Sequence, residues 1–368
     1  MRIAVVAHIR HPIRRPFMGG MEAHAWSLAD ALTGRGHDVT LVASGDSDER
    51  FRLAPIVAEH YDRDFPWHDF HGTDALNTHL DDAFARGSRI LRTGEFDIIH
   101  NNSLHRFPPR LGRQAHRPML TSLHVPPFGA LRRAMQDSLA PWCQATVTSR
   151  RQLAAWWSAP PKEAHVVPNG IDLSAWPYQP HGTGEAVWAG RITPTKGVHV
   201  AVRAARLAGC PLTLFGTIEH RDYYETEVKP HLGGAIRYGG HLDMRRLAHE
   251  IGRASVLLFT PLWDEPFGLA AIEAMACGVP VAALDNGAVR EVIGPCGAYA
   301  EDDSPEALAK AIPAALAIPR ADVHTRARQQ FSIETMVTRY ERLYALAMDG
   351  LSEAGPGVRY APHELALG

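Results

Sequence analysis

The sequence predicts an α/β protein made of two Rossmann-like βα domains that face each other across a cleft. Three observations support this fold class. Short, nearly continuous apolar runs alternate with helical patterns, a Pro- and Gly-rich break follows, and the same alternation then restarts. The chain has 368 residues, enough for about two domains at roughly 150 residues each. Ligands of such sheets bind at the carboxyl ends of the strands, so a site is expected in the cleft.

The alternation also predicts where the domains end. The break VVPNGIDLSAWPYQPHGTGE (166–185) reads as a connection because it is rich in Pro and Gly. The predicted organisation is an N-terminal domain over 1–167, a linker over 168–185, a C-terminal domain over 186–331, a helix over 332–348 that crosses back to the N-terminal domain, and a tail over 349–368.

In the N-terminal half, β-branched runs predict parallel strands that are covered on both faces. These runs are 2–8, 38–44, 97–100, 119–125 and 145–149. Helical spacing of Ala25, Leu28, Ala29 and Leu32 predicts a helix between the first two strands, so the three elements form a βαβ unit. The stretch 45–95 is predicted to be a long connection with a helix near 75–92. Long connections in compact folds are often functional.

The second half repeats this order with a shorter period. Strands are predicted in AVWAGRI, PLTLFG, AIRYGG, VLLFTP and PVAAL. Helices are predicted from 197, near 222–230, over 244–254, after Gly268, around 287–293, over 304–316 and over 332–348.

Composition excludes several classes of protein. A formal net charge of −2 does not suit a nucleic-acid binder, which is usually strongly basic. The four cysteines form no CxxC pair, so neither a zinc knuckle nor a redox motif is indicated. No signal peptide and no apolar stretch of membrane-spanning length is evident, and a cytoplasmic location is therefore expected.

Motifs of other enzyme classes are absent. The sequence has no GxGxxG, GxxxxGK[ST], HExxH or GxSxG motif. Asp-x-Asp occurs twice, at Asp46/Asp48 and Asp62/Asp64, in polar stretches. A hard cation needs more oxygen ligands than one such pair supplies, so no metal site is predicted.

Glycine-punctuated turns instead predict an anion site. Gly19 and Gly20 precede a helix, whose N-terminal amides suit an anion. Arg191 ends a strand and Lys196, one of only four lysines, precedes another helix. Two cations at a strand–loop–helix junction suit a diphosphate. A third turn lies at Gly268 in EPFGLAAIE, where the first helical amides lack partners within the helix.

Together these motifs resemble the family 4 glycosyltransferases, which are retaining enzymes of GT-B fold that use nucleotide sugars. The strongest element is a pair of glutamates separated by seven residues in EPFGLAAIEAMACGVPV (265–281). GRITPTKG, PNGID and FMGGME support it in the expected order, and the resemblance covers about residues 1–348. It implies transfer of a sugar from a UDP- or GDP-linked donor to an acceptor hydroxyl bound on the N-terminal side. It implies no cofactor beyond this co-substrate.

The resemblance also implies roles for individual residues. Glu265 and His124 would act at the sugar, and Glu273 would bind the ribose hydroxyls. Val125 follows His124 where the family often has an aspartate, so that aspartate has no counterpart here. The remaining contacts would be made to the diphosphate by Arg191, Lys196, Gly19 and Gly20, to the sugar by Phe267, Gly268 and Leu269, and to the base by Gly216 and His241.

Two other functions stay open at this point. A nucleotide-sugar epimerase on the same scaffold would turn over donor alone, and a non-catalytic nucleotide-sugar binder should lack the charged residues that this chain keeps.

No nucleophile is evident, so a metal-independent front-face mechanism is expected, with the leaving phosphate taking the acceptor's proton. No motif specifies the acceptor or the oligomeric state. The basic stretch RHPIRRP (10–16) leaves contact with an anionic acceptor or a membrane surface open.

Overall fold

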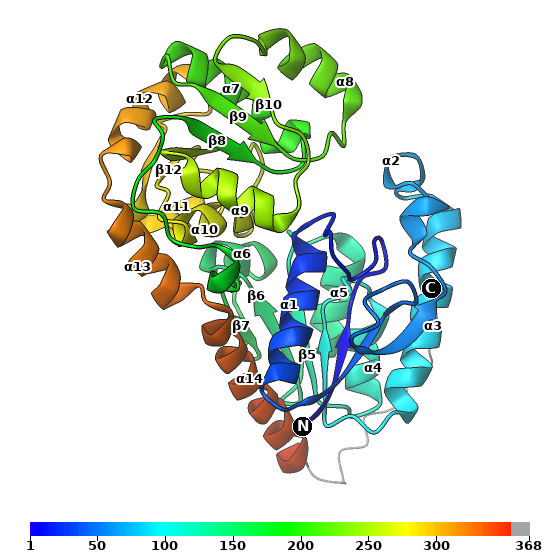
Figure 1. Cartoon of the computed structure of the whole chain (residues 1–368). Coiled ribbons are helices and arrows are strands. Elements are labelled where there is room, and N and C mark those ends of the chain that lie inside the picture. Colours follow the sequence, from blue (N-terminus) through cyan, green and yellow to red (C-terminus); the bar gives the residue numbers. More distant parts are fainter. Residues whose placement is uncertain (355–368) are drawn as a thin grey trace.

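The computed structural model describes residues 1–354 and contains two parallel sheets, each the centre of one domain (Figure 1). The N-terminal sheet has the order β3-β2-β1-β4-β5-β6-β7 and the C-terminal sheet the order β10-β9-β8-β11-β12-β13. Helices cover both faces of each sheet, and the apolar cores lie between sheet and helices. The predicted α/β fold with two βα domains is confirmed.

The strands are short and mostly buried. Those of the N-terminal sheet are β1 (Arg2–Val6), β2 (Asp38–Ser44), β3 (Arg52–Val57), β4 (Ile98–Asn101), β5 (Met119–Leu123), β6 (Cys143–Val147) and β7 (Ala164–Val166). Those of the C-terminal sheet are β8 (Ala186–Ala189), β9 (Leu212–Phe215), β10 (Ile236–Tyr238), β11 (Val256–Phe259), β12 (Val281–Ala283) and β13 (Gly297–Tyr299).

The helices follow the strands in both halves. In the N-terminal half they are α1 (Gly20–Gly34), α2 (Trp67–Phe70), α3 (Asp74–Thr93), α4 (Phe107–Gln114), α5 (Gly129–Ser138) and α6 (Arg150–Trp156). The later ones are α7 (Val198–Leu207), α8 (Arg221–Tyr223), α9 (Met244–Arg253), α10 (Leu269–Ala276), α11 (Val289–Ile293), α12 (Pro305–Leu316), α13 (Arg320–Gln330) and α14 (Ile333–Ala354). A short π-helix over Tyr224–Val228 lies within the helix predicted near 222–230.

Three strands, one helix of the second half and part of the C-terminus differ from the prediction. The helix is α13, which lies between the helices predicted over 304–316 and 332–348, where none was predicted. The strands β3, β7 and β13 were not predicted; each lies at the edge of a sheet. Edge strands bury less side-chain surface, so their apolar pattern is weak, and β3 even accommodates a proline, Pro55, which an interior strand would exclude. The predicted tail over 349–368 begins inside α14, which continues to Ala354. Residues 355–368 lie outside the described part of the chain.

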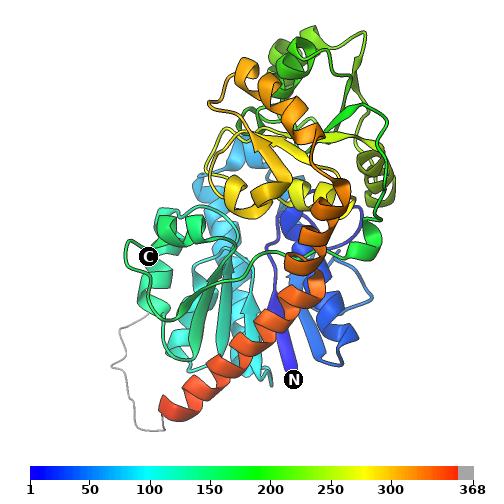
Figure 2. The same ribbon diagram turned by 90° about the vertical axis from the view of Figure 1, so that its left-hand side faces the viewer.

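The last helix, α14, lies against the N-terminal domain although it follows the C-terminal domain in sequence (Figure 1, Figure 2). Its buried face includes Tyr340 and Tyr344, which pack with residues of β1 and α1. The Tyr344 hydroxyl lies 2.6 Å from Nδ1 of His100, on β4. The chain therefore crosses between the domains twice.

Direct polar contacts join the two domains beside the cleft. The carbonyl oxygen of Pro266 accepts hydrogen bonds from the hydroxyls of Thr148 and Ser149, each at 2.9 Å. The first two amides of α6, at Arg150 and Arg151, donate to the carboxylate of Glu291 at 2.9 and 3.1 Å. A carboxylate at a helix N-terminus is favoured electrostatically. The first contact holds the loop 264–268 against the N-terminal domain, and the second holds α11 against it.

Candidate active site

Lys196 and Glu265 form the central ion pair of the site. The Lys196 Nζ lies 2.6 Å from Oε2 of Glu265, and the same oxygen accepts a hydrogen bond of 2.8 Å from the indole of Trp263. Glu265 is only 5% exposed. Gly197, which follows the lysine, has a φ of 63° and packs so closely on the carbonyl oxygen of Thr260 that a Cβ would lie 2.2 Å from it. The turn that carries Lys196 is thus fixed against the end of β11.

The two glycine-led turns meet across the cleft. Gly20 begins α1, and a Cβ added there would lie 2.5 Å from Cδ1 of Leu269, the first residue of α10. Gly268 has a φ of 98°, a left-handed conformation that glycine adopts without strain. Phe267 is buried against Phe331. The amino ends of α1 and α10 therefore approach one another from different domains, where both helix dipoles favour negative charge.

Arg191 follows β8 and pairs with a residue that the sequence analysis did not single out. Its Nη1 lies 2.6 Å from Oε2 of Glu219. The other oxygen of Glu219 lies 3.3 Å from Nη2 of Arg10, which in turn donates to Asp62 at 2.9 Å. The carboxylate of Glu219 is thereby shared between an arginine of each domain. No local pattern distinguishes Glu219 in the sequence, because its role depends on contact with the other domain.

Glu273 lies on α10 and is partly buried. Burial raises the pKa of its carboxyl to about 7. Within residues 1–354 no group donates a hydrogen bond to this carboxylate. The charged form of a buried carboxyl group is destabilised when no group donates a hydrogen bond to it. A ligand that supplied such donors would stabilise the charged form.

Gly216 and His241 lie at neighbouring strand ends of the C-terminal sheet. Gly216 follows β9 with a φ of 140°, and a Cβ there would lie 1.7 Å from the carbonyl oxygen of Gly190. Its own amide donates to Gly240, and its carbonyl oxygen accepts from the hydroxyl of Tyr238. His241 follows Gly240 and is exposed. The ends of β8, β9 and β10 are therefore brought close together.

His124 follows β5 and belongs to a group of histidines at the carboxyl edge of the N-terminal sheet. Its Nε2 donates to Oδ1 of Asn102 at 2.8 Å, and its ring centroid lies 4.4 Å from that of His24. Burial, together with the nearby His8, lowers the pKa of His124 to about 4. The imidazole is therefore neutral at physiological pH and can donate one hydrogen bond but carries no charge.

A cavity of about 780 Å³ opens beside these residues. Of the residues predicted for the site, Gly19, Gly20 and Arg191 line it. His8 and Glu22 line it as well, with Nε2 and Oε1 3.3 Å apart. The strand predicted over 2–8 contained His8, but nothing in the strand pattern indicated that its side chain reaches the cleft.

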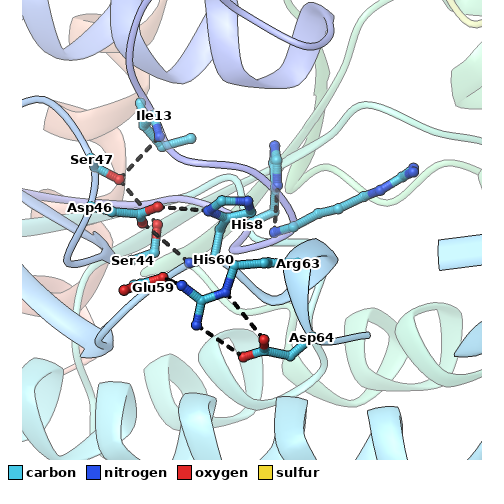
Figure 3. A network of polar contacts seen from close by, with 10 residues as sticks. His8, Ile13, Ser44, Asp46, Ser47, Glu59, His60, Arg63 and Asp64 are labelled. Atoms are coloured by element: carbon cyan, nitrogen blue, oxygen red, sulfur yellow. Dashed lines mark hydrogen bonds and ion pairs between the residues drawn. The ribbon is translucent and has the colours of Figure 1, made fainter. Parts of the chain in front are cut away.

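The four aspartates of the Asp-x-Asp pairs all have partners within the protein. Asp46 accepts from Nδ1 of His60 at 2.6 Å, and Asp64 pairs with Arg63 (Figure 3). Asp48 accepts from the indole of Trp26, and Asp62 is bound to Arg10. Among residues 1–354 no three His, Cys, Asp or Glu side chains are grouped so as to hold a metal ion.

Family models match both domains of the chain. The model described as Glycosyltransferase Family 4 matches residues 18–175, and that described as Glycosyl transferases group 1 matches residues 179–331. The two-domain fold with its cleft therefore defines a GT-B glycosyltransferase. The chain belongs to glycosyltransferase family 4.

Known proteins resemble the chain over nearly its full length. A glycogen synthase of Mycobacterium tuberculosis is 28% identical, with 99% of each chain covered, and a phosphatidyl-myo-inositol mannosyltransferase of Mycobacterium leprae is 27% identical, with 93% of each covered. The structure of a sucrose-phosphate synthase from Thermosynechococcus elongatus superposes with a TM-score of 0.77 at 20% identity, covering 96% of this chain and 100% of the other. Anabaena HepE in complex with UDP-glucose superposes at 0.71 and 18% identity, covering 94% and 99%. These structural likenesses establish the shared fold.

None of the described helices is both long enough and apolar enough to cross a membrane.

Proposed function

We propose that this glycosyltransferase moves a sugar from a nucleoside-diphosphate donor to an acceptor hydroxyl with retention of configuration and without a divalent metal. The observation that carries the proposal is the meeting of three turns in the cleft. Lys196, in the turn after β8, is paired with Glu265, and the glycine-led turns at Gly20 and Gly268 approach each other at Leu269. UDP-glucose in the related fold of HepE supports a UDP-linked donor. No further cofactor is needed for this chemistry.

The proposed roles follow from charge and position. Lys196 and Arg191 bind the diphosphate and offset the charge that develops on it as it leaves. Glu265, freed from Lys196 by that diphosphate, stabilises the positive charge that forms at the anomeric carbon. Glu273 accepts hydrogen bonds from ribose hydroxyls. Its unpartnered carboxylate supports that role.

The remaining contacts would be made by groups around this centre. Amides at Phe267, Gly268 and Leu269 bind sugar hydroxyls, and the base lies near Gly216 and His241. His124, kept neutral by burial and with its Nε2–H donated to Asn102, would accept a hydrogen bond from a sugar hydroxyl at Nδ1 rather than act as a charged acid. The amides of Gly19 and Gly20 approach the diphosphate from the N-terminal domain.

The step conserves charge and atoms. The acceptor oxygen forms a bond to the anomeric carbon on the face from which the diphosphate leaves. The bond from that carbon to the phosphate oxygen breaks, and the leaving phosphate takes the acceptor's proton. No side chain is required as nucleophile.

The first test measures binding and turnover of donors without acceptor. UDP, GDP and their glucose and mannose esters are screened by thermal shift, since a ligand at 100 times its dissociation constant adds about 2.7 kcal/mol. Slow hydrolysis of the bound donor supports a transferase, whereas an epimerised sugar or a donor that is bound but never consumed overturns the proposal. Glu265→Gln should then lower kcat with little change in the donor KM, because the carboxylate acts on charge present only in the transition state.

A further inference from the structure

One wall of the cavity beside the site contains none of the residues proposed to contact the donor. This wall comes from the segment 61–84, which includes η1 (Tyr61–Arg63), α2 and the first turns of α3. The same segment lies in the long connection for which a function was expected. The opposite wall is the loop after β1 and the turn at Gly19–Gly20. The cavity therefore runs from the N-terminal domain to the point where Gly20 meets Leu269.

The cavity walls are mainly apolar and aromatic. Trp67, Leu80 and Phe84 line it from the segment 61–84, and Phe128 and Met18 line its mouth. Phe128 and Met18 are 44% and 41% exposed, so both can contact a ligand at the cavity. The ring of Phe84 stacks on His105, with centroids 4.3 Å apart and an interplanar angle of 9°. Such surfaces favour a ligand with an apolar or aromatic body.

Every guanidinium that lines the cavity is already matched by a carboxylate. Arg106 makes a bidentate pair with Asp81, at 2.6 and 2.7 Å. Arg10 and Arg191 share Glu219, and Arg10 also binds Asp62.

Together with Glu22, four carboxylates face these three guanidiniums. With Arg191 assigned to the donor, an acceptor phosphate would have to displace Arg10 or Arg106 from its carboxylate, so the cavity wall does not favour a charged acceptor.

One polar group at the inner end of the cavity lacks a partner. The Nε2 of His8 is buried and makes no hydrogen bond within residues 1–354, although it lies 3.3 Å from Oε1 of Glu22. The Nδ1 of His8 accepts from the amide of Arg10, so the ring's proton is on Nε2. A hydroxyl can accept from such an N–H and donate to the neighbouring carboxylate. The Glu22 carboxylate lies beside Gly19, at the donor end of the cavity.

We propose that the acceptor is an uncharged compound with an apolar or aromatic body, bound in this cavity with one of its hydroxyls between His8 and Glu22. The inference rests on the proposed transferase function. It assigns Trp67, Phe84 and Phe128 to the acceptor's body. It excludes a phosphorylated polyol as the preferred acceptor.

The test compares three probes in the presence of UDP. These are 4-nitrophenyl α-D-glucopyranoside, myo-inositol and myo-inositol 1-phosphate, which differ in aromatic body and in charge. Saturation-transfer NMR measures their binding without any chemistry, and UDP release from UDP-glucose measures their use as acceptors. The aromatic glucoside should bind at least tenfold more tightly than inositol phosphate and accelerate UDP release most. Equal or tighter binding of inositol phosphate overturns the inference.

A pair of variants ties this binding to the cavity. Phe128→Ala should weaken binding of the aromatic glucoside about fivefold. The control is Leu316→Ala, at the end of α12, which removes a side chain with the same exposed fraction, 44%. This control should leave binding of the glucoside unchanged. Both variants should keep the wild-type thermal shift with UDP. If UDP stabilises the protein but Phe128→Ala binds the glucoside normally, the acceptor inference fails while the donor site stands. If UDP gives no stabilisation, the proposed function fails first.

Discussion

Lys196 and Glu265 are 69 positions apart in the chain, and their side chains neutralise each other directly, with Nζ and Oε2 2.6 Å apart. A donor diphosphate would compete with Glu265 for the same ammonium group. Binding of the donor and release of the Glu265 carboxylate toward the sugar would then be one event. The following predictions separate the parts of this arrangement.

Removing Lys196 should lower both the free energy of unfolding and kcat/KM, and a second substitution at Glu265 should restore only the first. Lys196→Ala leaves the buried Glu265 carboxylate without its cation and should cost about 3 kcal/mol in the free energy of unfolding. The double variant Lys196→Ala/Glu265→Gln should recover most of that loss, because no buried charge remains. Both variants should still lose on the order of 2–4 kcal/mol of transition-state stabilisation. Urea denaturation and kcat/KM measure the two effects, and a double variant as unstable as the single one would refute the pairing.

Glu273→Gln should change how stability depends on pH. The folded carboxyl has a pKa of about 7, above the ordinary value of 4.5, so the folded protein binds this proton more tightly than the unfolded chain. Wild-type stability should therefore fall as pH rises from about 4.5 to 7, and the glutamine variant should lack this fall. At pH 8 the variant should be more stable by up to about 3 kcal/mol.

Saturating UDP should reduce that advantage, since ribose hydroxyls would stabilise the charged carboxylate of the wild type. The variant should also show a raised donor KM with kcat little changed. Thermal melts at pH 5 and pH 8, with and without UDP, measure both effects. An unchanged donor KM contradicts the ribose assignment.

Glu219→Gln should strengthen binding of UDP. The substitution removes the carboxylate that Arg191 and Arg10 share, so Arg191 becomes more available to a diphosphate. A gain of about threefold in affinity corresponds to roughly 0.6 kcal/mol. Glu225→Gln, which breaks the exposed pair with Lys229 in the same domain, is the matched control. Isothermal titration calorimetry compares the two, and weaker binding to Glu219→Gln would show that the carboxylate orders Arg191 rather than competing for it.

Chelation of metal should leave activity unchanged. Cations and helix N-termini are proposed to take the place of a divalent ion at the diphosphate. Wild type assayed with excess EDTA and with magnesium should show the same rate. Loss of turnover in EDTA that magnesium restores would bring Asp46, Asp48, Asp62 and Asp64 back as candidate ligands.

Gly216→Ala should destabilise the C-terminal domain strongly. Its Cβ would lie 1.7 Å from the carbonyl oxygen of Gly190, and its φ of 140° is unfavourable for alanine. Gly209→Ala is the control, because Gly209 also has a positive φ, 62°, but open space around it. The control should cost about 1 kcal/mol and Gly216→Ala clearly more. Equal losses in chemical denaturation would mean that the approach of the two strand ends is not tight.

The sequence predicted the central strands of each sheet better than the strands at the sheet edges. Central strands such as β1 and β11 are continuous apolar runs, because helices cover both faces of the sheet. The edge strands β3, β7 and β13 are short and only partly buried, and they gave no comparable signal.

The same contrast holds at the site. Lys196 and Gly20 were predicted from turns with recognisable local spacing, and Glu265 from the two-glutamate motif that carries the family resemblance. Glu219, Arg10 and His8 were missed as site residues, since each acquires its partner only when segments far apart in the chain are folded against one another.

The return of α14 to the N-terminal domain affects the order in which the protein can fold during synthesis. Tyr340, Tyr344 and Ala347 complete the same apolar core as β1, yet the ribosome makes them more than 300 residues later than Val5. Domains usually fold as they emerge. Here the half that is made first must leave the apolar surface beside α1 that α14 covers open until the second half has left the ribosome. The nascent chain therefore exposes that apolar surface to chaperones for most of its translation.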